Sequence, residues 1–453
     1  MPGKYFIKTY GCQMNDLDGQ QMGRLLQGRG MVAVSEPDDA DLILVNTCSI
    51  REKASQKVYS DVGRFRSLKL KRPEVILGVT GCQAEAEGSH LLKRFPYLDL
   101  VMGPDHTGKL PDLVQGLLQD RKVRSAQVGF VKPEEYQFLN LLPDEEENAT
   151  KAFITIMKGC DNFCSFCIVP YVRGREVCRE PEEIIAEARE LGRQGVREVT
   201  LLGQNVNSYG VGRHNEEARV KKGKSPFIPF SELLHRIAED TEVERIRFTT
   251  SHPKDMPDAL IEEFGRNNKL ARHLHLPVQS GSDEVLTKMY RGYTREDYLD
   301  RLRRLRAVDP QIALSTDIIV GFPGETEEDF QATMDLLREV RFDSIYSFVY
   351  SPRPKTTAAL YFSDDVSTEI KQERLQRLQS LQDEITYEKN QAWVGQTVHV
   401  LVEGPSKQGE TLCGRSSQNH VVHLEAGTEQ VGKVLPVRVM HAGPNCLRGV
   451  LDG

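Results

Sequence analysis

Long hydrophobic segments are missing from this chain of 453 residues. No apolar run approaches the roughly 18 residues that a membrane-spanning helix needs, which argues against a membrane protein. Residues 1–7 already have the pattern of a β-strand and lack the hydrophobic centre of a secretory signal. These absences predict a cytoplasmic protein in a reducing compartment, where cysteines serve as ligands or reactive thiols rather than as disulfides.

A strong charge of either sign is also missing. The net charge is −7, and 39% of the residues are hydrophobic and 28% charged. This composition is typical of globular domains with well-formed cores. The negative net charge does not indicate a nucleic-acid-binding protein. A local basic face can still attract RNA to a protein of weak overall charge. The length predicts about three domains.

Residues 1–120 alternate apolar runs with helical patterns, as parallel βαβ units do. The runs lie at residues 4–10, 41–46 and 75–80. The fold class predicted for this first domain is therefore α/β, with a parallel βαβ sheet. Residues 121–145 break the rhythm and lead into an acidic run at residues 144–147, so we interpret them as a linker.

Residues 146–378 resume the alternation of strands and helices. Six strand-like runs lie at residues 153–157, 198–202, 245–249, 273–276, 312–319 and 344–350. Six repeats are too few for a standard eight-stranded barrel, and they predict a partial (β/α)6 TIM-like barrel with room for a large substrate. The charged insertion at residues 213–224 is interpreted as a mobile surface loop.

The sequence pattern changes within residues 379–453, from helical to short strands. The end of a long helical pattern, residues 368–390, leads into short alternating strands separated by glycines. These strands lie at residues 398–402, 421–424 and 434–439. The pattern predicts a small antiparallel β-barrel of the oligonucleotide-binding kind.

Cys160, Cys164 and Cys167 form a CxxxCxxC run directly after a predicted strand. Three thiolates can hold three corners of a [4Fe–4S] cluster and leave the fourth iron without a protein ligand. The amino and carboxylate groups of S-adenosylmethionine can chelate that iron, and an electron from the cluster can then release a 5′-deoxyadenosyl radical. A zinc loop is the alternative, but zinc usually needs a fourth ligand and paired spacings, which this stretch lacks.

Cys12, Cys48 and Cys82 are far apart in sequence, yet each follows a predicted strand, at intervals of 36 and 34 residues. Each interval is about one βαβ unit. Parallel strands end at one edge of their sheet, where ligands bind, and neighbouring strands lie ~4.8 Å apart. The pattern predicts a second open [4Fe–4S] cluster. Three buried core thiols are the alternative, which the adjacent Gly and Thr residues at the strand ends disfavour. The remaining cysteines, Cys178, Cys413 and Cys446, have no metal-ligand spacing, so we expect structural or incidental roles for them.

The motifs around the six cysteines resemble those of the radical S-adenosylmethionine methylthiotransferases, most closely the branch that acts on tRNA. The matching stretches are residues 10–15, 46–52, 81–84, 160–167, 170–176, 250–253, 276–281 and 321–326. The resemblance spans nearly the whole chain, and Gln13-Met14-Asn15 favours the tRNA branch. Gly19 and Cys178 depart from the family, which commonly has Ser at both positions, but neither is a predicted ligand.

The resemblance implies a methylthiotransferase domain, a radical core and a C-terminal TRAM domain. It also implies two [4Fe–4S] clusters, S-adenosylmethionine as cofactor and two molecules of it per turnover. The expected reaction converts N6-isopentenyladenosine at position 37 of tRNA into its 2-methylthio derivative. Cys160, Cys164 and Cys167 would serve radical generation, and Cys12, Cys48 and Cys82 would hold the sulfur donor. Carbon 2 of adenine bears only a hydrogen, so a radical route is chemically reasonable.

Polar residues at the strand ends of the partial barrel are candidates for the S-adenosylmethionine pocket, because barrel active sites form there. They are Gln204, Asn205, Ser251, Gln279 and Gly321. RNA contacts are expected from two regions, the end of the cysteine loop and the segment that resembles the TRAM signature. The residues are Arg173, Arg175, Arg415 and Asn419.

The expected partners are a tRNA anticodon stem-loop and a flavodoxin- or ferredoxin-like electron donor, with no membrane association and a monomer as the default. Two alternatives stay open. A sibling methylthiotransferase would act on another modified adenosine or on a ribosomal protein side chain. A non-enzymatic iron–sulfur RNA-binding sensor would not explain why both cysteine sets leave an iron open.

Overall fold

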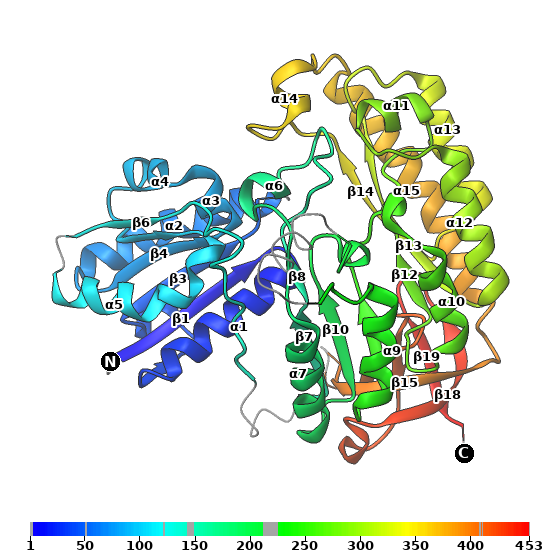
Figure 1. Cartoon of the computed structure of the whole chain (residues 1–453), viewed down its shortest axis with the longest axis horizontal. Helices are drawn as coiled ribbons and strands as arrows, with labels where there is room; N and C mark the ends of the chain where they lie inside the picture. The colour runs from blue at the N-terminus through cyan, green and yellow to red at the C-terminus, as the bar shows by residue number, and fades with distance from the viewer. Residues whose placement is uncertain are drawn as a thin grey trace. The chain divides into compact units, whose positions relative to one another are not determined.

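The computed structural model of the chain describes residues 3–49, 52–120, 123–142, 149–211, 225–406, 409 and 411–452, with residues 52–56 described by their backbone alone. The acidic run at 144–147 and the insertion at 213–224 lie outside these ranges. The chain forms two compact units (Figure 1). The N-terminal unit comprises Met1–Leu141, Lys158–Asp161 and Cys167–Val177, and the C-terminal unit comprises Leu142–Met157, Asn162–Phe166 and Cys178–Gly453.

The N-terminal unit is built on a six-stranded, fully parallel sheet with the order β2-β1-β3-β4-β5-β6. The strands are β1 (Gly3–Tyr10), β2 (Met31–Ala33), β3 (Leu42–Thr47), β4 (Ile76–Gly81), β5 (Leu100–Met102) and β6 (Ser125–Gln127). The helices are α1 (Gln13–Gln27), α2 (Glu52–Lys71), α3 (Cys82–Glu87), α4 (Ser89–Arg94) and α5 (Leu110–Gln119). The predicted parallel βαβ sheet is confirmed.

Apolar side chains cover both faces of this sheet. Ile43 and Val45 of β3 pack in a cluster with Val58 of α2, whereas Leu42 and Leu44 face a second cluster with α1 and α5. A central strand buried on both faces reads as a continuous apolar run. This is why β3 and β4 could be recognised in the sequence, as the runs at residues 41–46 and 75–80.

The edge strand β6 lies inside the segment that was predicted to be a linker. Ser125–Gln127 pairs in parallel with β5, so the first part of residues 121–145 belongs to the sheet. Its three residues are half-buried, and only Ala126 is apolar. A strand of this kind has no apolar pattern that a sequence analysis could detect.

The C-terminal unit contains the six predicted strands of the partial barrel, in two parallel sheets. One has the order β11-β10-β7 and the other β12-β13-β14, and a parallel bridge joins Ile246 of the first sheet to Leu270, shortly before the second. The strands are β7 (Lys151–Thr155), β10 (Glu198–Leu202), β11 (Arg245–Phe248), β12 (His273–His275), β13 (Ala313–Val320) and β14 (Ser344–Val349).

Helices flank these strands in Figure 1. They are α7 (Pro181–Arg193), α9 (Phe230–Asp240), α10 (Asp258–Arg266), α11 (Asp283–Lys288), α12 (Arg295–Val308), α13 (Glu327–Val340), α14 (Thr357–Tyr361) and α15 (Thr368–Gln391). The cysteine loop is bordered by the short elements β8 (Met157–Lys158), α6 (Val169–Val172) and β9 (Val177–Cys178). No helix among those described is long and apolar enough to cross a membrane.

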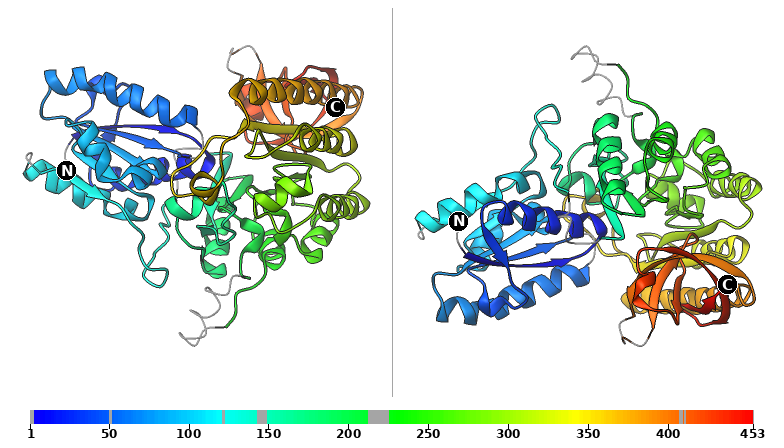
Figure 2. Two further views of the ribbon diagram at one scale, coloured as in Figure 1. Left: turned by 90° about the horizontal axis from the view of Figure 1, so that it is seen from above. Right: turned by 90° about the horizontal axis from the view of Figure 1, so that it is seen from below.

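The chain ends in a closed five-stranded barrel, which Figure 2 shows beside α15. Its strands are β15 (Thr397–Pro405), β16 (Leu412–Ser416), β17 (Val421–Leu424), β18 (Val434–Ala442) and β19 (Leu447–Leu451). All pairs are antiparallel except β17–β19. The barrel is fixed to the core, because Arg247 Nη2 donates to the carbonyl of Ser416 at 2.6 Å and Arg245 Nη1 to that of Arg415 at 3.0 Å. Both arginines are buried against Glu198.

Candidate active site

Cys12, Cys48 and Cys82 lie at one edge of the N-terminal sheet. They follow the neighbouring strands β1, β3 and β4, whose registers align Tyr10 with Thr47 and Thr47 with Gly81. The amide of Cys48 donates to the carbonyl of Tyr10 at 3.1 Å, which ties the first two strand ends together. The parallel topology therefore brings these three cysteines to the same level.

The side chain of Asn15 lies between two of the sulfurs, and Cys48 contacts Cys12. Asn15 Oδ1 lies 3.8 Å from Cys12 Sγ and 3.9 Å from Cys82 Sγ. A hydrogen bond with Cys48 lowers the pKa of Cys12 to about 6, and the charge of Arg173 lowers it further against the effect of burial. Burial raises the pKa of Cys82.

Two glycines allow the strand ends to approach. Gly11 has φ +131°, and a Cβ there would lie 2.3 Å from Cβ of Cys48. Gly81 has φ +86°, and a Cβ there would lie 2.5 Å from Asn46 Oδ1. Both positions combine a backbone conformation that favours glycine with the absence of space for a side chain. The glycine before Cys12 and the glycine before Cys82 are required by the geometry of the site.

Arg173, at the end of α6, donates to this cysteine set. Its Nε lies 3.1 Å from Cys82 Sγ, and its Nη2 lies 2.9 Å from Asn15 Oδ1 and 2.6 Å from Asp18 Oδ2. Only 6% of the Arg173 side chain is exposed. Although burial alone would lower the pKa of Arg173, Asp18 and Cys82 raise it well above its usual value. Arg173 therefore lacks the exposed guanidinium that the predicted RNA contact requires.

The residues at this edge fit an iron–sulfur cluster. Three buried polar atoms beside the cysteines have no hydrogen-bond partner among the described residues: Asn46 Oδ1, Ser49 Oγ and Thr80 Oγ1. Thiolates are the usual ligands of such clusters. In the part of the chain that the structure describes, no three His, Cys, Asp or Glu side chains converge on a single metal ion. A cluster does not require this, since each thiolate binds a different iron.

Cys160, Cys164 and Cys167 lie in the loop between β8 and α6. Cys160 and Cys167 belong to the N-terminal unit, where the amide of Cys160 donates to the carbonyl of Gly174 at 3.2 Å. Cys164 belongs to the C-terminal unit. There the amide of the next residue, Ser165, donates to the carbonyl of Met289 at 3.0 Å. The two ends of the loop therefore belong to the N-terminal unit, whereas its middle part is held by a backbone hydrogen bond within the C-terminal unit.

Arg291 and His252 face the sulfur of Cys164. Arg291 Nη1 lies 3.3 Å and His252 Nε2 3.8 Å from Cys164 Sγ. Arg291 also donates from Nη2 to the carbonyl of Pro277 at 2.6 Å and from Nε to the hydroxyl of Tyr293 at 3.0 Å. Burial lowers the pKa of His252 to about 2, and the charge of Arg291 lowers it further. His252 is neutral, so Arg291 is the charged group that faces Cys164.

The candidate cofactor residues of the partial barrel differ in whether they have a buried polar atom that a ligand could contact. Asn205 Nδ2 donates to Asp255 Oδ2 at 2.8 Å, a carboxylate that also accepts from Asn162 at 3.0 Å. Asn205 Oδ1 and Ser251 Oγ are buried and have no partner over the described ranges. These two atoms fit a bound polar ligand such as S-adenosylmethionine.

Gln279 and Gln204 are less clearly directed at a ligand. Gln279 has φ +78°, and its amide donates to the carbonyl of Asp317 at 2.9 Å, so its backbone extends the pairing beside β13. Gln204 is half-buried in the bend after β10. Both remain predictions as cofactor contacts.

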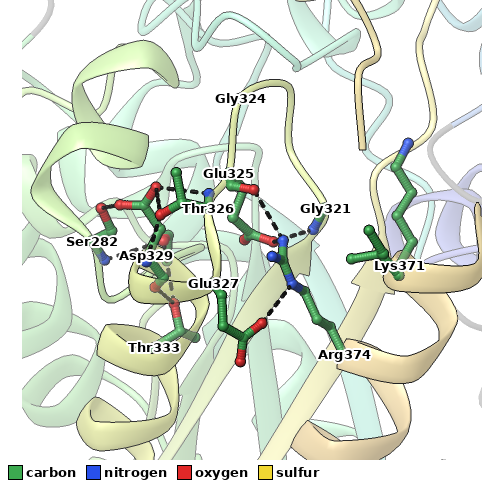
Figure 3. A network of polar contacts seen from close by, with 12 residues as sticks. Ser282, Gly321, Gly324, Glu325, Thr326, Glu327, Asp329, Thr333, Lys371 and Arg374 are labelled. Carbon is green, nitrogen blue, oxygen red and sulfur yellow. Dashed lines mark hydrogen bonds and ion pairs between the residues drawn. The ribbon is translucent and has the colours of Figure 1, made fainter. Parts of the chain in front are cut away.

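The loop at Gly321 is held by a buried ion pair, shown in Figure 3. The Gly321 amide donates to Glu325 Oε2 at 2.7 Å, and Arg374 Nη1 donates to the same oxygen at 2.8 Å. The side chains of Glu325 and Arg374 are 1% and 5% exposed. Because Arg374 lies on α15, 49 residues beyond Glu325, no local motif in the sequence indicates this partner.

Among the remaining candidates for RNA binding, Arg175 is exposed, and Arg415 and Asn419 are half-buried. Arg175 Nε lies 3.1 Å from Asp161 Oδ1, and 47% of its side chain is exposed. Arg415 Nη1 donates to the carbonyl of Asn419 at 3.2 Å and to its Oδ1 at 3.3 Å, which closes the turn after β16. Their contacts with RNA stay predictions.

Arg291 has no feature in the sequence that marks it as a functional residue. It is separated from Cys164 by 127 residues and carries no ligand-type side chain. His252 and Asn15 belong to the stretches that resemble the methylthiotransferases, which was the available signal for them. Asp255 could have been suspected from its position after the third barrel strand.

Comparisons with known proteins agree with this arrangement. Residues 154–337 match the radical SAM superfamily, residues 4–103 the uncharacterized protein family UPF0004, and residues 391–451 the TRAM domain. Two relatives carry the name tRNA-2-methylthio-N(6)-dimethylallyladenosine synthase. The one from Syntrophotalea carbinolica is 46% identical over 443 residues, 97% of this chain and 98% of the relative. The one from Geobacter metallireducens is 48% identical over 447 residues, 98% of each chain.

A solved structure has the same fold. It is the radical S-adenosylmethionine methyltransferase TsrM from Kitasatospora setae, which is 16% identical with a TM-score of 0.54, over 79% of this chain and 75% of that chain. At this identity the likeness concerns the fold alone. The near-full-length identity to the two relatives, together with the three matched domains, shows that the chain belongs to the family of tRNA-2-methylthio-N(6)-dimethylallyladenosine synthases within the radical SAM superfamily.

Proposed function

We propose that the chain is a methylthiotransferase that converts N6-isopentenyladenosine at position 37 of tRNA into its 2-methylthio derivative. The names of the relatives support the substrate, and the TRAM barrel supports RNA binding. The observation that carries the proposal is the position of Cys12, Cys48 and Cys82 at the aligned ends of three neighbouring strands, because a radical-generating loop by itself has no sulfur to transfer.

Two cofactor sites follow from this assignment. Cys160, Cys164 and Cys167 would hold one [4Fe–4S] cluster, and Cys12, Cys48 and Cys82 a second. When bound, the clusters and two molecules of S-adenosylmethionine per turnover supply the one-electron, methyl and sulfur chemistry. The protein contributes the ligands, the orientation and the charges around them.

Side chains of the partial barrel would position S-adenosylmethionine. Asn205 Oδ1 can accept a hydrogen bond and Ser251 Oγ can donate or accept one, and both atoms are buried. Arg374 and Glu325 fix the Gly321 backbone, which leaves that loop preorganised for a ligand. Preorganisation reduces the entropy that must be lost when the reactants are brought together.

The RNA would be held by exposed cations and by the TRAM barrel. Arg175, Arg415 and Asn419 are the proposed contacts. The target base must leave the stack of the anticodon stem-loop, because its carbon 2 cannot be reached inside it. We further propose a monomer in the cytoplasm that receives electrons from a flavodoxin- or ferredoxin-like protein.

Mass spectrometry of tRNA nucleosides from a deletion strain tests the reaction. We expect the methylthio-isopentenyl nucleoside to vanish, to return with the wild-type chain and with Cys446→Ala, and to stay absent with Cys12→Ala. If this nucleoside persists in the deletion strain, the substrate assignment is wrong. Loss of a different methylthiolated nucleoside or of a methylthiolated ribosomal protein would identify a sibling activity instead.

A second assay separates an enzyme from an iron–sulfur sensor. The anaerobically reconstituted chain is incubated with S-adenosylmethionine and a reductant, and 5′-deoxyadenosine is measured. The proposal expects its formation, and none would form if the chain only bound RNA through a structural cluster.

A further inference from the structure

In each cysteine set a buried arginine donates to a cysteine sulfur, but the surroundings of these two arginines differ in charge. We propose that Arg291 places a positive charge without a carboxylate partner beside Cys164, whereas Asp18 offsets part of the charge of Arg173 beside Cys82, so that the two clusters have different reduction potentials. Arg291 and Arg173 act through the ligands and are positioning residues. The inference rests on the assignment of both cysteine sets as cluster ligands.

Arg291 has no carboxylate partner among the residues that the structure describes. Its donors reach a carbonyl, a phenol and the sulfur of Cys164, at 2.6, 3.0 and 3.3 Å. Its exposed fraction is 4%. The carboxylate of Asp255 lies near His252 but pairs with Lys254 at 2.7 Å. As a cluster ligand, Cys164 would therefore be a counter-charge for Arg291.

Arg173 has a carboxylate partner. Asp18 Oδ2 lies 2.6 Å from its Nη2, and 16% of the Asp18 side chain is exposed. The ion pair is neutral overall, so Asp18 offsets part of the positive charge that Arg173 brings to Cys82 with its hydrogen bond at 3.1 Å. Arg173 orients the side chain of Cys82. Arg291 orients the side chain of Cys164 and also brings a positive charge that no carboxylate among the described residues offsets.

The sign of the effect follows from the charge of the cluster. Reduction adds one negative charge, and a nearby cation stabilises the more negative state. In a buried site this stabilisation is weakly screened by solvent and salt. Net charge and hydrogen bonds to the sulfurs are among the factors that set iron–sulfur potentials. Arg291 should therefore ease reduction of the radical-generating cluster, and Asp18 should oppose reduction of the other.

A redox titration of the full-length holoprotein, followed by electron paramagnetic resonance, tests this. Chains in which Cys12, Cys48 and Cys82, or Cys160, Cys164 and Cys167, are changed to Ala retain one cluster each and assign the two signals. In Arg291→Gln we expect the reduced-to-oxidised ratio of the Cys164 cluster to fall about tenfold at a fixed potential, which is 59 mV for a one-electron couple. Arg291→Lys keeps the charge and should restore most of the ratio.

Asp18→Asn gives an independent arm with the opposite sign. It leaves Arg173 unbalanced, so the ratio for the Cys82 cluster should rise, while the Cys164 cluster stays unchanged. Unshifted potentials in both Arg291→Gln and Asp18→Asn, or equal shifts of both clusters, would overturn the inference. Should Arg291→Gln lose its cluster, Arg291→Lys and Asp18→Asn decide the outcome. A wild-type chain with about four irons instead of about eight would contradict the proposed function itself, which separates the two failures.

Discussion

Cys12, Cys48 and Cys82 are held by three strand ends of one sheet, whereas Cys160, Cys164 and Cys167 share one loop. The first set exists only when β1, β3 and β4 are paired in register. The second set lies within nine consecutive residues, from Gly159 to Cys167. The difference teaches that one set depends on the global fold and the other on local sequence.

The arginines extend the comparison. Arg173 is separated from Cys82 by 91 residues and Arg291 from Cys164 by 127 residues. Both sets thus depend on a distant cation, and the sets differ in whether a carboxylate balances it.

Loss of one cysteine should separate the two sets by function. Cys160→Ala should abolish both 5′-deoxyadenosine formation and methylthiolation, because no electron reaches S-adenosylmethionine. Cys12→Ala should abolish methylthiolation alone. Both products are measured by mass spectrometry, with Cys446→Ala as the control that keeps both. The division of labour fails if Cys12→Ala also stops cofactor cleavage while the Cys160 cluster remains loaded.

A methyl group at Gly11 should damage the strand-end set selectively. Gly11→Ala places a Cβ 2.3 Å from Cys48 Cβ and strains a backbone with φ +131°. We expect iron to fall from about eight to about four per chain. Gly129→Ala is the matched control, because Gly129 has φ +99° and no atom within 4 Å. It should carry only the strain of about 1–3 kcal/mol and retain its iron. Equal iron loss in both variants would count against the close approach at Cys48.

The two arginines should differ in their contribution to stability when iron is absent. Arg173→Met leaves Asp18 without its partner and should destabilise the N-terminal unit by about 3–5 kcal/mol. Arg291→Met removes an unbalanced buried charge, so it should cost the C-terminal unit less than about 1 kcal/mol. Hydrogen exchange of peptides from each unit measures both effects separately. A larger cost for Arg291→Met would show that its charge is balanced by another group.

The smallest effect concerns RNA. Arg175→Ala should weaken binding of the anticodon stem-loop a few-fold and reduce the salt dependence by about one ion. Arg193→Ala is the control, because Arg193 is also exposed and also pairs with a carboxylate, Glu190 at 2.5 Å. Filter binding across a salt series measures both. Identical salt slopes for Arg175→Ala and the wild-type chain would remove Arg175 from the RNA interface.

Local patterns and parallel topology made much of the fold and the cysteine grouping predictable. The buried apolar runs of β3 and β4 predicted the parallel sheet. The positions of Cys48 and Cys82 directly after these strands predicted that both lie at the same edge of that sheet. Three features were not predictable for physical reasons. β6 has a single apolar residue. Arg173 reads as an RNA contact until its pairing with Asp18 is seen. Arg291 reaches Cys164 only through the tertiary fold.

The central claim is that the chain carries two clusters, each on three cysteines. Iron per chain measures this most directly in the wild type and in the two variants in which either Cys12, Cys48 and Cys82 or Cys160, Cys164 and Cys167 are changed to Ala. The account predicts about eight, about four and about four irons. About four irons in the wild type, or about eight in the variant lacking Cys12, Cys48 and Cys82, would contradict it.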